Sequence, residues 1–281
     1  MKKKNNNSLA AYPYLIWSII FIVIPLILVL FYSLTTKTPE GTKFSLDNFK
    51  RLMDPLYIKV LLRSLELALK STLLCLLLGY PVAYIISKLP LSKRNTIIML
   101  FILPMWMNFL LRTYAWMSIL GKNGVLNTIL TSIGLPAMNI LYTDTAVMLG
   151  MVYNFLPFMV IPIYTVLTKI DKDLINAAAD LGANRKNIFL KIILPLSTPG
   201  IMSGITMVFM PAVSTFVISR LLGGGQFMLV GNLIEQQFTT TGDWNFGSAI
   251  SIFMMIIILI SMAIMSRFDT ENSKEGGGQL C

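Results

Sequence analysis

Histidine is absent from this 281-residue chain, and charged residues make up only 13% of it. The absence of histidine excludes Ser-His-Asp triads, histidine-ligated zinc and the HExxH motif. Soluble domains contain about 25% charged residues. Half that share, together with a mean hydropathy of +0.71, predicts a polytopic membrane protein and excludes a secreted, cytosolic or disordered one.

Groups that bind cofactors or carry out reactions are also scarce. The two cysteines, Cys75 within an apolar run and Cys281 at the last position, are too few for a disulfide framework or a metal cage. No GxxxxGK[ST] sequence occurs, so the chain has no P-loop for ATP. We therefore predict that the chain is not an enzyme and has no catalytic residue, no metal and no cofactor of its own.

The chain is basic, with a net charge of +10 and a pI of about 9.6. In a soluble protein this balance would suggest a nucleic-acid partner. Here most Lys and Arg residues lie between apolar runs, as membrane topology requires, and no RRM, zinc-finger or basic-helix pattern is present. We predict contact with membrane lipid and no nucleic-acid partner.

Six apolar runs approach the length of about 20 residues that crosses a bilayer. They cover about residues 14–34, 65–86, 97–120, 146–167, 201–222 and 246–265. The first run is long and no A-x-A site follows it, so we read it as an uncleaved helix rather than a signal peptide. The sequence predicts an all-α membrane protein with six transmembrane helices in one domain over 1–281, and a flexible tail at 271–281.

The distribution of basic residues predicts the orientation. With the N-terminus inside, the inside segments hold 13 Lys and Arg residues and the outside segments hold 7. This bias places both termini in the cytoplasm. Two outside segments have patterns of their own. Residues 45–53 form either an interfacial amphipathic helix or a solvated loop, and residues 121–143 are too polar to span but are expected to hold a short helix.

The segment Ile170–Gly200, IDKDLINAAADLGANRKNIFLKIILPLSTPG, is the most informative stretch. Asp171 is placed to cap a helix that Gly182 ends in a left-handed turn. Asn184 is placed to cap a second helix, which Pro195 and Pro199 interrupt before the fifth run. We predict a helix, a glycine turn and a second helix, and interpret this unit as a docking element for a soluble partner.

These residues resemble the EAA loop of ABC importer permeases, whose pattern is E-A-A-x-x-x-G, nine residues, then I-x-L-P. The spacing of the pattern fits throughout. The resemblance implies a type I importer fold in which this loop couples the permease to a separate ATPase chain that binds ATP and magnesium. Asn176 stands where the family has glutamate. The implied coupling residues are Asn176, Ala177, Ala178, Gly182, Ile192, Leu194 and Pro195.

Most of the chain, from about residue 12 to 266, also resembles the PotB-type permeases of spermidine/putrescine importers. Three segments carry this resemblance: LPMWMNFLLRTYAWMSILG (103–121), LYTDTAVMLGMVYNFLPFMVIPIY (141–164) and FMPAVSTFVISRLLGGG (209–225). It implies transport of polyamines across a bacterial inner or plasma membrane. It also implies three partners: a PotC-like second permease, a PotA-like ATPase dimer and a PotD-like extracellular or periplasmic substrate-binding protein.

A polyamine path should offer carbonyls, carboxylates and aromatic faces, and polar residues at membrane depth are candidates by default. Asn154 beside Tyr153 either lines the path or makes helix–helix hydrogen bonds. Trp106 and Tyr114 near Asn108 either line it or form an interfacial aromatic belt. The resemblance adds the fifth run, which helps form the gate in type I importers. The candidate path residues are Trp106, Asn108, Tyr114, Tyr153, Asn154, Ser214, Thr215 and Phe216.

Three other functions compete with this interpretation. A type I ABC permease for another solute shares the EAA loop. An ion-coupled secondary transporter normally has inverted repeats and ionisable residues at broken helices, and the sequence has no clear repeat and almost no carboxylates within the apolar runs. A membrane-embedded enzyme would lack histidine and have few carboxylates for acid–base chemistry.

Overall fold

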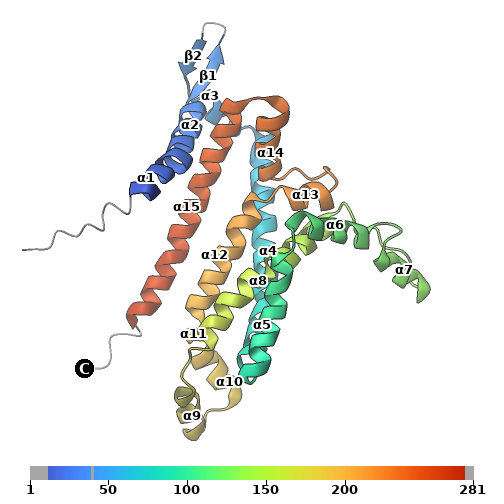
Figure 1. Ribbon diagram of the computed structural model, residues 1–281, viewed down its shortest axis with the longest axis vertical. Helices are drawn as coiled ribbons and strands as arrows, with labels where there is room; N and C mark the ends of the chain where they lie inside the picture. The colour runs from blue at the N-terminus through green and yellow to red at the C-terminus, as the bar shows by residue number, and fades with distance from the viewer. Residues whose placement is uncertain (1–11, 39–40, 276–281) are drawn as a thin grey trace, which may run out of the picture. The chain divides into compact units, whose positions relative to one another are not determined.

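The computed structural model describes residues 12–38 and 41–275, and most of them are helical (Figure 1). The chain divides into two compact units, one of Met1–Lys59 with Leu233–Ile257 and the other of Val60–Asn232 with Ile258–Cys281. We call them the first and the second unit. Both contain segments that the sequence assigns to the membrane, so the single permease domain over 1–281 stays a prediction.

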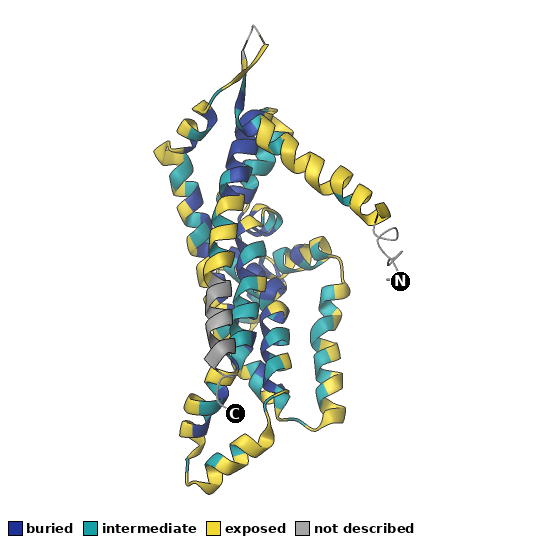
Figure 2. Ribbon diagram, turned by 90° about the vertical axis from the view of Figure 1, so that its left-hand side faces the viewer, coloured by how far each residue is buried: buried dark blue, intermediate teal, exposed yellow. Residues whose placement is uncertain are grey.

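The first unit begins with a long helical segment and a hairpin. Its elements along the chain are α1 (Tyr12–Ser18), η2 (Ile19–Val23), α2 (Ile24–Ser33), β1 (Thr35–Thr38), β2 (Gly41–Phe44) and α3 (Asp47–Leu52). In Figure 2 the helix nearest the N-terminus is almost wholly exposed. Its hydropathy of 2.9 and its lack of burial within the described chain suit a helix surrounded by lipid or by another subunit.

The antiparallel hairpin of β1 and β2 is absent from the sequence-based expectations. Thr35 lies opposite Phe44 at its base. Two buried asparagines hold this base, because Asn48 Nδ2 and Asn245 Nδ2 donate to the Thr35 carbonyl at 2.9 and 2.7 Å. α3 follows directly, which confirms a short helix rather than a loop at this position.

The second unit contains most of the long helices. Its elements are α4 (Pro55–Ser87, which begins in the first unit), α5 (Leu91–Trp106), α6 (Phe109–Leu120), α7 (Val125–Ser132), α8 (Asp144–Leu167), α9 (Lys172–Asp180), α10 (Arg185–Ile188), η3 (Phe189–Ile193), α11 (Leu194–Leu196), α12 (Thr198–Ser214) and α13 (Val217–Leu222). The remaining elements, α14 (Val230–Gln236), η4 (Gln237–Thr241) and α15 (Trp244–Glu275), complete the described chain.

α8 is the central helix of the second unit, and α12 and α4 pack closely against it. A Cβ added to Gly204 would lie 2.7 Å from Met159 Sδ, and one added to Gly200 would lie 3.0 Å from Ile163 Cα. On α4, a Cβ at Gly79 would lie 3.0 Å from Met159 Cγ. Small residues at these places allow the helices to approach closely, as in membrane bundles. Met159 and Ile163 are fully buried as a result.

Two π-helical turns each lie just before a proline. η2 precedes Pro25, and η3 precedes Pro195. Proline has no N–H and its ring displaces the carbonyl four residues earlier, so the preceding turn widens instead of continuing as a regular α-helix. Pro195 was predicted to interrupt the second helix of the 170–200 segment, and the structure has this interruption as a widened turn.

Four helices in the described residues are long and apolar enough to cross a membrane: Tyr12–Ser33, Pro55–Ser87, Asp144–Leu167 and Trp244–Ile264. Two bent pairs raise the number to six if each pair is one span. Leu91–Trp106 and Phe109–Ser132 meet at 92°, and Arg185–Leu196 and Thr198–Ser214 meet at 58°.

The expectation of one continuous helix was wrong at two of the six runs. The run 97–120 stops at Trp106 and restarts at Phe109, because the Asn108 side chain accepts the Leu110 and Leu111 N–H groups and starts a new helix. The run 201–222 stops at Ser214 and restarts at Val217. A hydropathy window of about 19 residues averages over breaks of two residues and does not register them.

The C-terminal tail differs partly from expectation. α15 continues to Glu275, so residues 271–275 are helical rather than a flexible tail. Residues 276–281, with the glycines at 276–278, lie outside the described residues.

Candidate coupling loop and translocation path

The predicted N-cap of the first loop helix is confirmed. α9 begins after Asp171, whose Oδ1 accepts the Asp173 N–H at 2.9 Å. The Asp173 carboxylate lies in the first turn, where the helix dipole favours an anion. This cap fixes where α9 leaves the end of α8.

The predicted glycine turn is also confirmed. The N–H of Gly182 donates to the Ala179 carbonyl at 2.9 Å, and the N–H of Ala183 donates to the Ala178 carbonyl at 3.0 Å. This pair of bonds is the Schellman arrangement, in which the residue after the helix adopts a left-handed conformation. Gly182 has φ +82°, a region that side chains with a Cβ rarely adopt.

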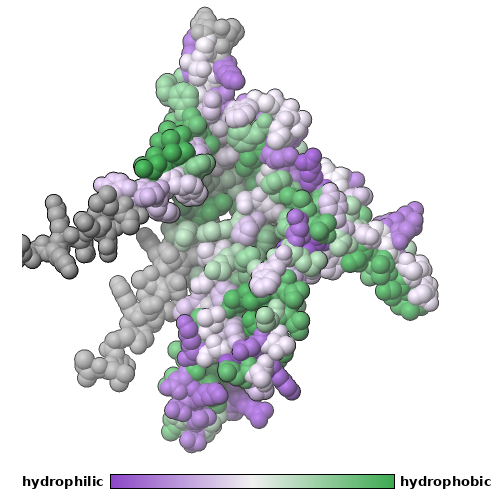
Figure 3. Space-filling view, in the orientation of Figure 1, coloured by the Kyte–Doolittle hydropathy of each residue, from purple (hydrophilic) through white to green (hydrophobic). Residues whose placement is uncertain are grey.

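α9 projects from the rest of the second unit. All its residues are exposed or half-buried, among them Asn176, Ala177 and Ala178. Leu181, directly before the glycine, is 88% exposed. Figure 3 shows hydrophilic side chains gathered over α9 and α10, the end of this unit that Figure 1 shows at the bottom. An exposed, capped helix with apolar Leu and Ala side chains is suited to dock into a groove of another protein.

The second half of the loop, α10 and η3, packs against the rest of the second unit, whereas α9 does not. Asn184 caps α10 by accepting the Asn187 N–H at 2.8 Å, as predicted. Ile188 and Ile193 are buried. Phe189 meets two rings of α4 edge-on, with centroid distances of 5.9 Å to Tyr80 and 5.4 Å to Tyr84.

A polar contact adds to this anchor at the start of α12. Ser197 Oγ donates to the Leu194 carbonyl at 2.9 Å, so the Tyr80 hydroxyl at 2.9 Å donates to Ser197 Oγ. Ile192 and Leu194 are half-buried, and Pro195 is exposed. The I-x-L-P segment therefore connects the loop to the long helix α12 at a point where α4 holds it.

The sequence pattern did not identify these anchoring contacts. Phe189 matches no position of the EAA-loop pattern, and Tyr80 and Tyr84 lie within the second apolar run. Aromatic residues four apart on a predicted helix give a weak signal, because they share a face.

The first break in the helices carries part of the predicted path. Trp106 ends α5 and is 82% exposed, Asn108 caps α6, and Tyr114 on α6 is exposed. In hydrocarbon, irregular backbone is tolerated only where it is buried in protein or lines a cavity. These residues therefore lie beside a break in the helices, and both roles expected for them, lining the path or forming an aromatic belt, stay predictions.

The second break carries the other predicted group. Ser214 ends α12, Thr215 and Phe216 separate it from α13, and α13 packs on α6, the helix that follows the first break. Asn232, which sequence analysis missed, supports the break. Its Nδ2 donates to the Phe216 carbonyl at 2.9 Å, and its Oδ1 accepts from Ser219 Oγ.

Tyr153 and Asn154 differ in their surroundings although they are adjacent. Tyr153 is exposed and meets Trp116 at 5.3 Å between ring centroids, beside a cavity of about 320 Å³. Asn154 is 2% exposed, and its Nδ2 donates to the Gly150 carbonyl of its own helix at 2.8 Å. Its Oδ1 is buried with no hydrogen-bond partner in the described part of the chain. The bond to Gly150 lies within α8 rather than between helices, and the side chain is buried, so neither role expected for Asn154 is visible.

The sequence patterns also did not predict an ion pair between Arg63 and Asp144. Arg63 Nη2 contacts both carboxylate oxygens of Asp144, at 2.7 and 2.9 Å, and its guanidinium lies 4.3 Å from the centre of the Phe227 ring. The pair connects α4 to the start of α8. Over residues 12–38 and 41–275, no cluster of three or more Cys, Asp or Glu side chains is arranged to hold a metal ion.

Comparisons with known proteins agree along most of the chain. Residues 3–273 match the family model described as "Binding-protein-dependent transport system inner membrane component". The spermidine/putrescine transport system permease protein PotB of Escherichia coli (strain K12) is 41% identical over 256 residues, which cover 89% of this chain and 93% of that protein. PotB of Haemophilus influenzae is 40% identical over 258 residues, covering 89% and 90%.

Solved structures show the same fold. A chain from the crystal structure of a bacterial ABC transporter involved in the import of the acidic polysaccharide alginate has a TM-score of 0.79 at 20% identity, and the match covers 94% of this chain and 96% of that one. A second structure holds the alginate transporter in complex with an alginate pentasaccharide-bound periplasmic protein, with a TM-score of 0.78 at 19% identity and coverage of 92% and 91%.

Proposed function

Because the chain belongs to the family of binding-protein-dependent transport system inner membrane components, we propose that it is the permease subunit of an ATP-driven importer for spermidine and putrescine. Membership makes it a multi-pass inner-membrane protein. The observation that carries the choice of substrate is the identity of 41% to a spermidine/putrescine permease over 89% of the chain. The alginate transporters share only the fold at 20% identity or less, and so do not favour a polysaccharide.

The chain acts with three partners in this proposal. A second, PotC-like permease completes the membrane path. A PotA-like ATPase dimer binds ATP and magnesium and docks on α9. A PotD-like binding protein delivers the polyamine on the opposite face. The exposed Leu181, Ala177 and Asn176 support ATPase docking at α9, since they present an apolar patch beside one amide that can donate and accept hydrogen bonds.

The anchoring contacts describe how motion of the ATPase reaches the membrane. A push on α9 passes through the Gly182 turn to α10 and η3. Phe189 then transmits it to Tyr80 and Tyr84 of α4, and Ser197 transmits it to α12. Packed side chains carry such coupling because they have discrete arrangements rather than a continuous range.

The two helix breaks support the proposed path. Trp106, Asn108 and Tyr114 lie at or after the first break, and Ser214, Thr215 and Phe216 lie at the second. Aromatic faces bind desolvated cations with about 2 kcal/mol or more, and Tyr153 with Trp116 adds a further aromatic surface. Asn154 would join the path in a state that exposes it.

The orientation follows from the same proposal. The α9 end of the second unit faces the cytoplasm, where the ATPase is, and the short helix α7 lies outside. The excess of basic residues in the predicted inside segments supports both termini being cytoplasmic.

Uptake of labelled spermidine tests the proposal. The chain is expressed with its genomic neighbours in cells that lack their own polyamine importers, and unlabelled putrescine, amino acids and phosphate compete. We expect uptake that requires this chain and ATP and that polyamines alone block. Uptake that survives ATP depletion would instead indicate an ion-coupled transporter. A complex that assembles with its ATPase but takes up no polyamine would contradict the proposed substrate, while leaving the proposal of an ABC permease intact.

A matched pair of tryptophans tests the path. Trp106 lies at the first break, and Trp17 is exposed on the first apolar helix. We expect Trp106→Leu to raise the KM for spermidine about tenfold, as the loss of a cation–π contact predicts, and Trp17→Leu to leave it unchanged. Equal effects of the two substitutions would contradict a path at the first break.

A further inference from the structure

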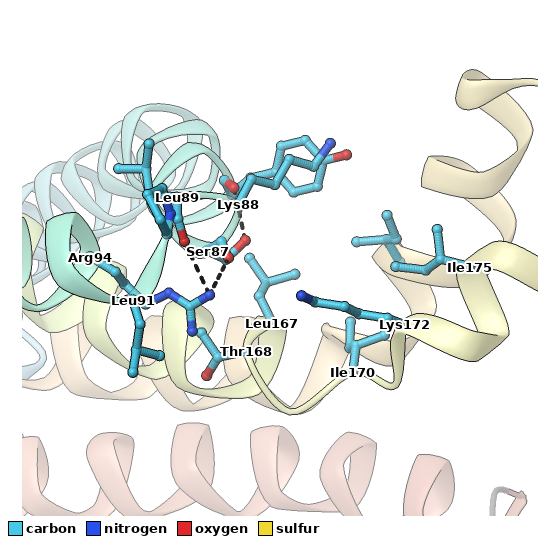
Figure 4. Close-up of a pocket in the computed structure, with 13 residues that line it drawn as sticks. Ser87, Lys88, Leu89, Leu91, Arg94, Leu167, Thr168, Ile170, Lys172 and Ile175 are labelled. Carbon is cyan, nitrogen blue, oxygen red and sulfur yellow. Dashed lines mark hydrogen bonds between the residues drawn. The ribbon is translucent and has the colours of Figure 1, made fainter.

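A pocket of about 710 Å³ lies beside the coupling loop, where the ends of four helices meet in the second unit. The end of α4, the start of α5, the end of α8 and the start of α9 surround it (Figure 4). Ser87 ends α4, and Leu167 ends α8. The pocket therefore lies at the level where two of the long apolar helices end.

Three cations line this pocket. Figure 4 shows the Arg94 guanidinium and the Lys172 ammonium pointing toward each other from opposite sides. Lys88 lies at the edge, where its Nζ is 4.0 Å from the centre of the Tyr84 ring. The described lining contains no Asp or Glu to balance these charges.

The Arg94 side chain is held in place, but not all of its hydrogen-bond donors have an acceptor. Its Nη2 donates to the Ser87 carbonyl at 3.0 Å and to the Leu89 carbonyl at 3.3 Å. Its Nε is buried and has no hydrogen-bond partner in the described part of the chain. The buried Nε shows that the guanidinium is not fully paired within the described chain, and the lining holds three cations without an acid, so an anion in the pocket would balance their charge.

Apolar side chains surround the cations and restrict the kind of anion. Leu89, Leu91, Ile170, Ile175 and Ile193 line the same pocket. Free phosphate gains nothing from leucine and isoleucine, whereas a phospholipid places its phosphate next to its acyl chains. Basic pockets between membrane helices on the cytoplasmic side bind lipid head groups in this way.

We infer that this pocket binds the phosphate group of an anionic phospholipid, with the acyl chains resting on the leucine and isoleucine side chains beside it. The inference rests on the proposed function only for the orientation, which places the α9 end in the cytoplasmic leaflet. Because the bound lipid would touch Lys172 of α9 and Arg94 of α5 together, it would hold the coupling helix against the membrane helices.

Lipid titration of the assembled complex tests this site. The complex is purified through an affinity tag on this chain, and native mass spectrometry follows the binding of phosphatidylglycerol and of phosphatidylcholine. The test variant carries Lys88→Gln with Lys172→Gln. The matched control carries Lys169→Gln with Lys186→Gln, which removes the same charge from exposed residues that do not line the pocket.

We expect the unmodified complex to prefer phosphatidylglycerol, and the test variant to lose about tenfold in affinity for it, given the contribution of each basic residue near anionic lipid. The control should keep its affinity. Each lysine is also changed alone, so a fold defect of the double variant does not obscure the result. Excess inorganic phosphate should fail to displace the lipid.

Several outcomes would overturn the assignment. Equal binding of the two lipids, or an equal loss in the control, would show that no specific site exists. Displacement by inorganic phosphate would identify a soluble anion instead. A test variant that keeps its lipid affinity but releases the ATPase would show that the lysines bind the ATPase. Spermidine uptake is not part of this measurement. A negative result for the lipid site can therefore be distinguished from a failure of the proposed function.

Discussion

The ring of Phe189 meets the ring of Tyr84 edge-on, with 5.4 Å between the centroids and an interplanar angle of 74°. A second edge contact joins Phe189 to Tyr80 at 5.9 Å. One side chain of the coupling loop thus contacts two successive turns of α4. These contacts tie the second half of the loop to α4, whereas no residue of α9 is buried.

Phe189→Ala should uncouple the transporter. The two edge contacts are worth about 1–3 kcal/mol together beyond burial. We expect the stimulation of ATP hydrolysis by loaded binding protein to fall about tenfold, with all subunits still copurifying. Hydrolysis assays on the reconstituted complex measure this. Phe189→Tyr keeps the ring and should restore coupling, and full stimulation in the alanine variant would show that the contacts do not transmit motion.

Gly182→Ala should weaken the docking of the ATPase. At φ +82° a Cβ costs about 1–2 kcal/mol, while the space around Gly182 is open, so the cost is purely one of backbone conformation. We expect the α9 turn to reorient and ATPase retention on a pull-down column to decrease several-fold.

Gly134→Ala is the matched control, because Gly134 has φ +81° and equally open surroundings after α7. It carries the same strain outside the coupling loop and should leave ATPase retention unchanged. If both variants release the ATPase alike, general destabilisation rather than the loop geometry is responsible.

Gly204→Val should separate α12 from α8. The added Cβ would lie 2.7 Å from Met159 Sδ and 3.2 Å from the Met159 carbonyl, and overpacking of this kind costs about 1–3 kcal/mol. We expect a lower melting temperature of the purified complex. Met207→Val, on the exposed face of α12, introduces the same β-branched residue and should change the melting temperature little. Equal shifts would contradict close packing at Gly204.

Asn245→Ala should loosen the hairpin of β1 and β2. Asn245 Nδ2 donates to the Thr35 carbonyl at 2.7 Å, to Thr35 Oγ1 at 3.0 Å and to the Tyr32 carbonyl at 3.1 Å. Leaving buried acceptors unpaired costs about 1–3 kcal/mol each. We expect faster hydrogen exchange at residues 35–38 and 41–44, measured by mass spectrometry. Asn139→Ala, at an exposed position, should not alter exchange in the hairpin. Unchanged exchange in the Asn245 variant would show that the hairpin is stable without the Asn245 hydrogen bonds.

Features set by neighbouring residues could be predicted from the sequence. The hydrogen bonds at Asp171, Gly182 and Asn184 join groups only two to five residues apart. The residue types and their spacing were therefore enough to predict the two caps and the turn. The apolar runs were found for a similar reason, because a bilayer imposes length and hydropathy on each segment.

Features that depend on contacts between distant residues could not be predicted. The break at Thr215 and Phe216 is supported by Asn232, 16 residues beyond the carbonyl that it binds. Phe189 finds its ring partners on a helix more than 100 residues earlier. The hairpin depends on Asn245, which is 210 residues from Thr35. A hydropathy pattern contains no information on such pairings.

The exposed tip of the coupling loop also affects how the cell handles this chain before assembly. Leu174 on α9 and Leu181 directly after it are exposed, and in the proposed complex the ATPase covers them. A copy without its partners therefore displays an apolar segment next to an exposed glycine turn, the kind of surface that chaperones and proteases recognise. If the ATPase docks as proposed, the abundance of the permease should follow the supply of its ATPase, because docking would cover these apolar side chains.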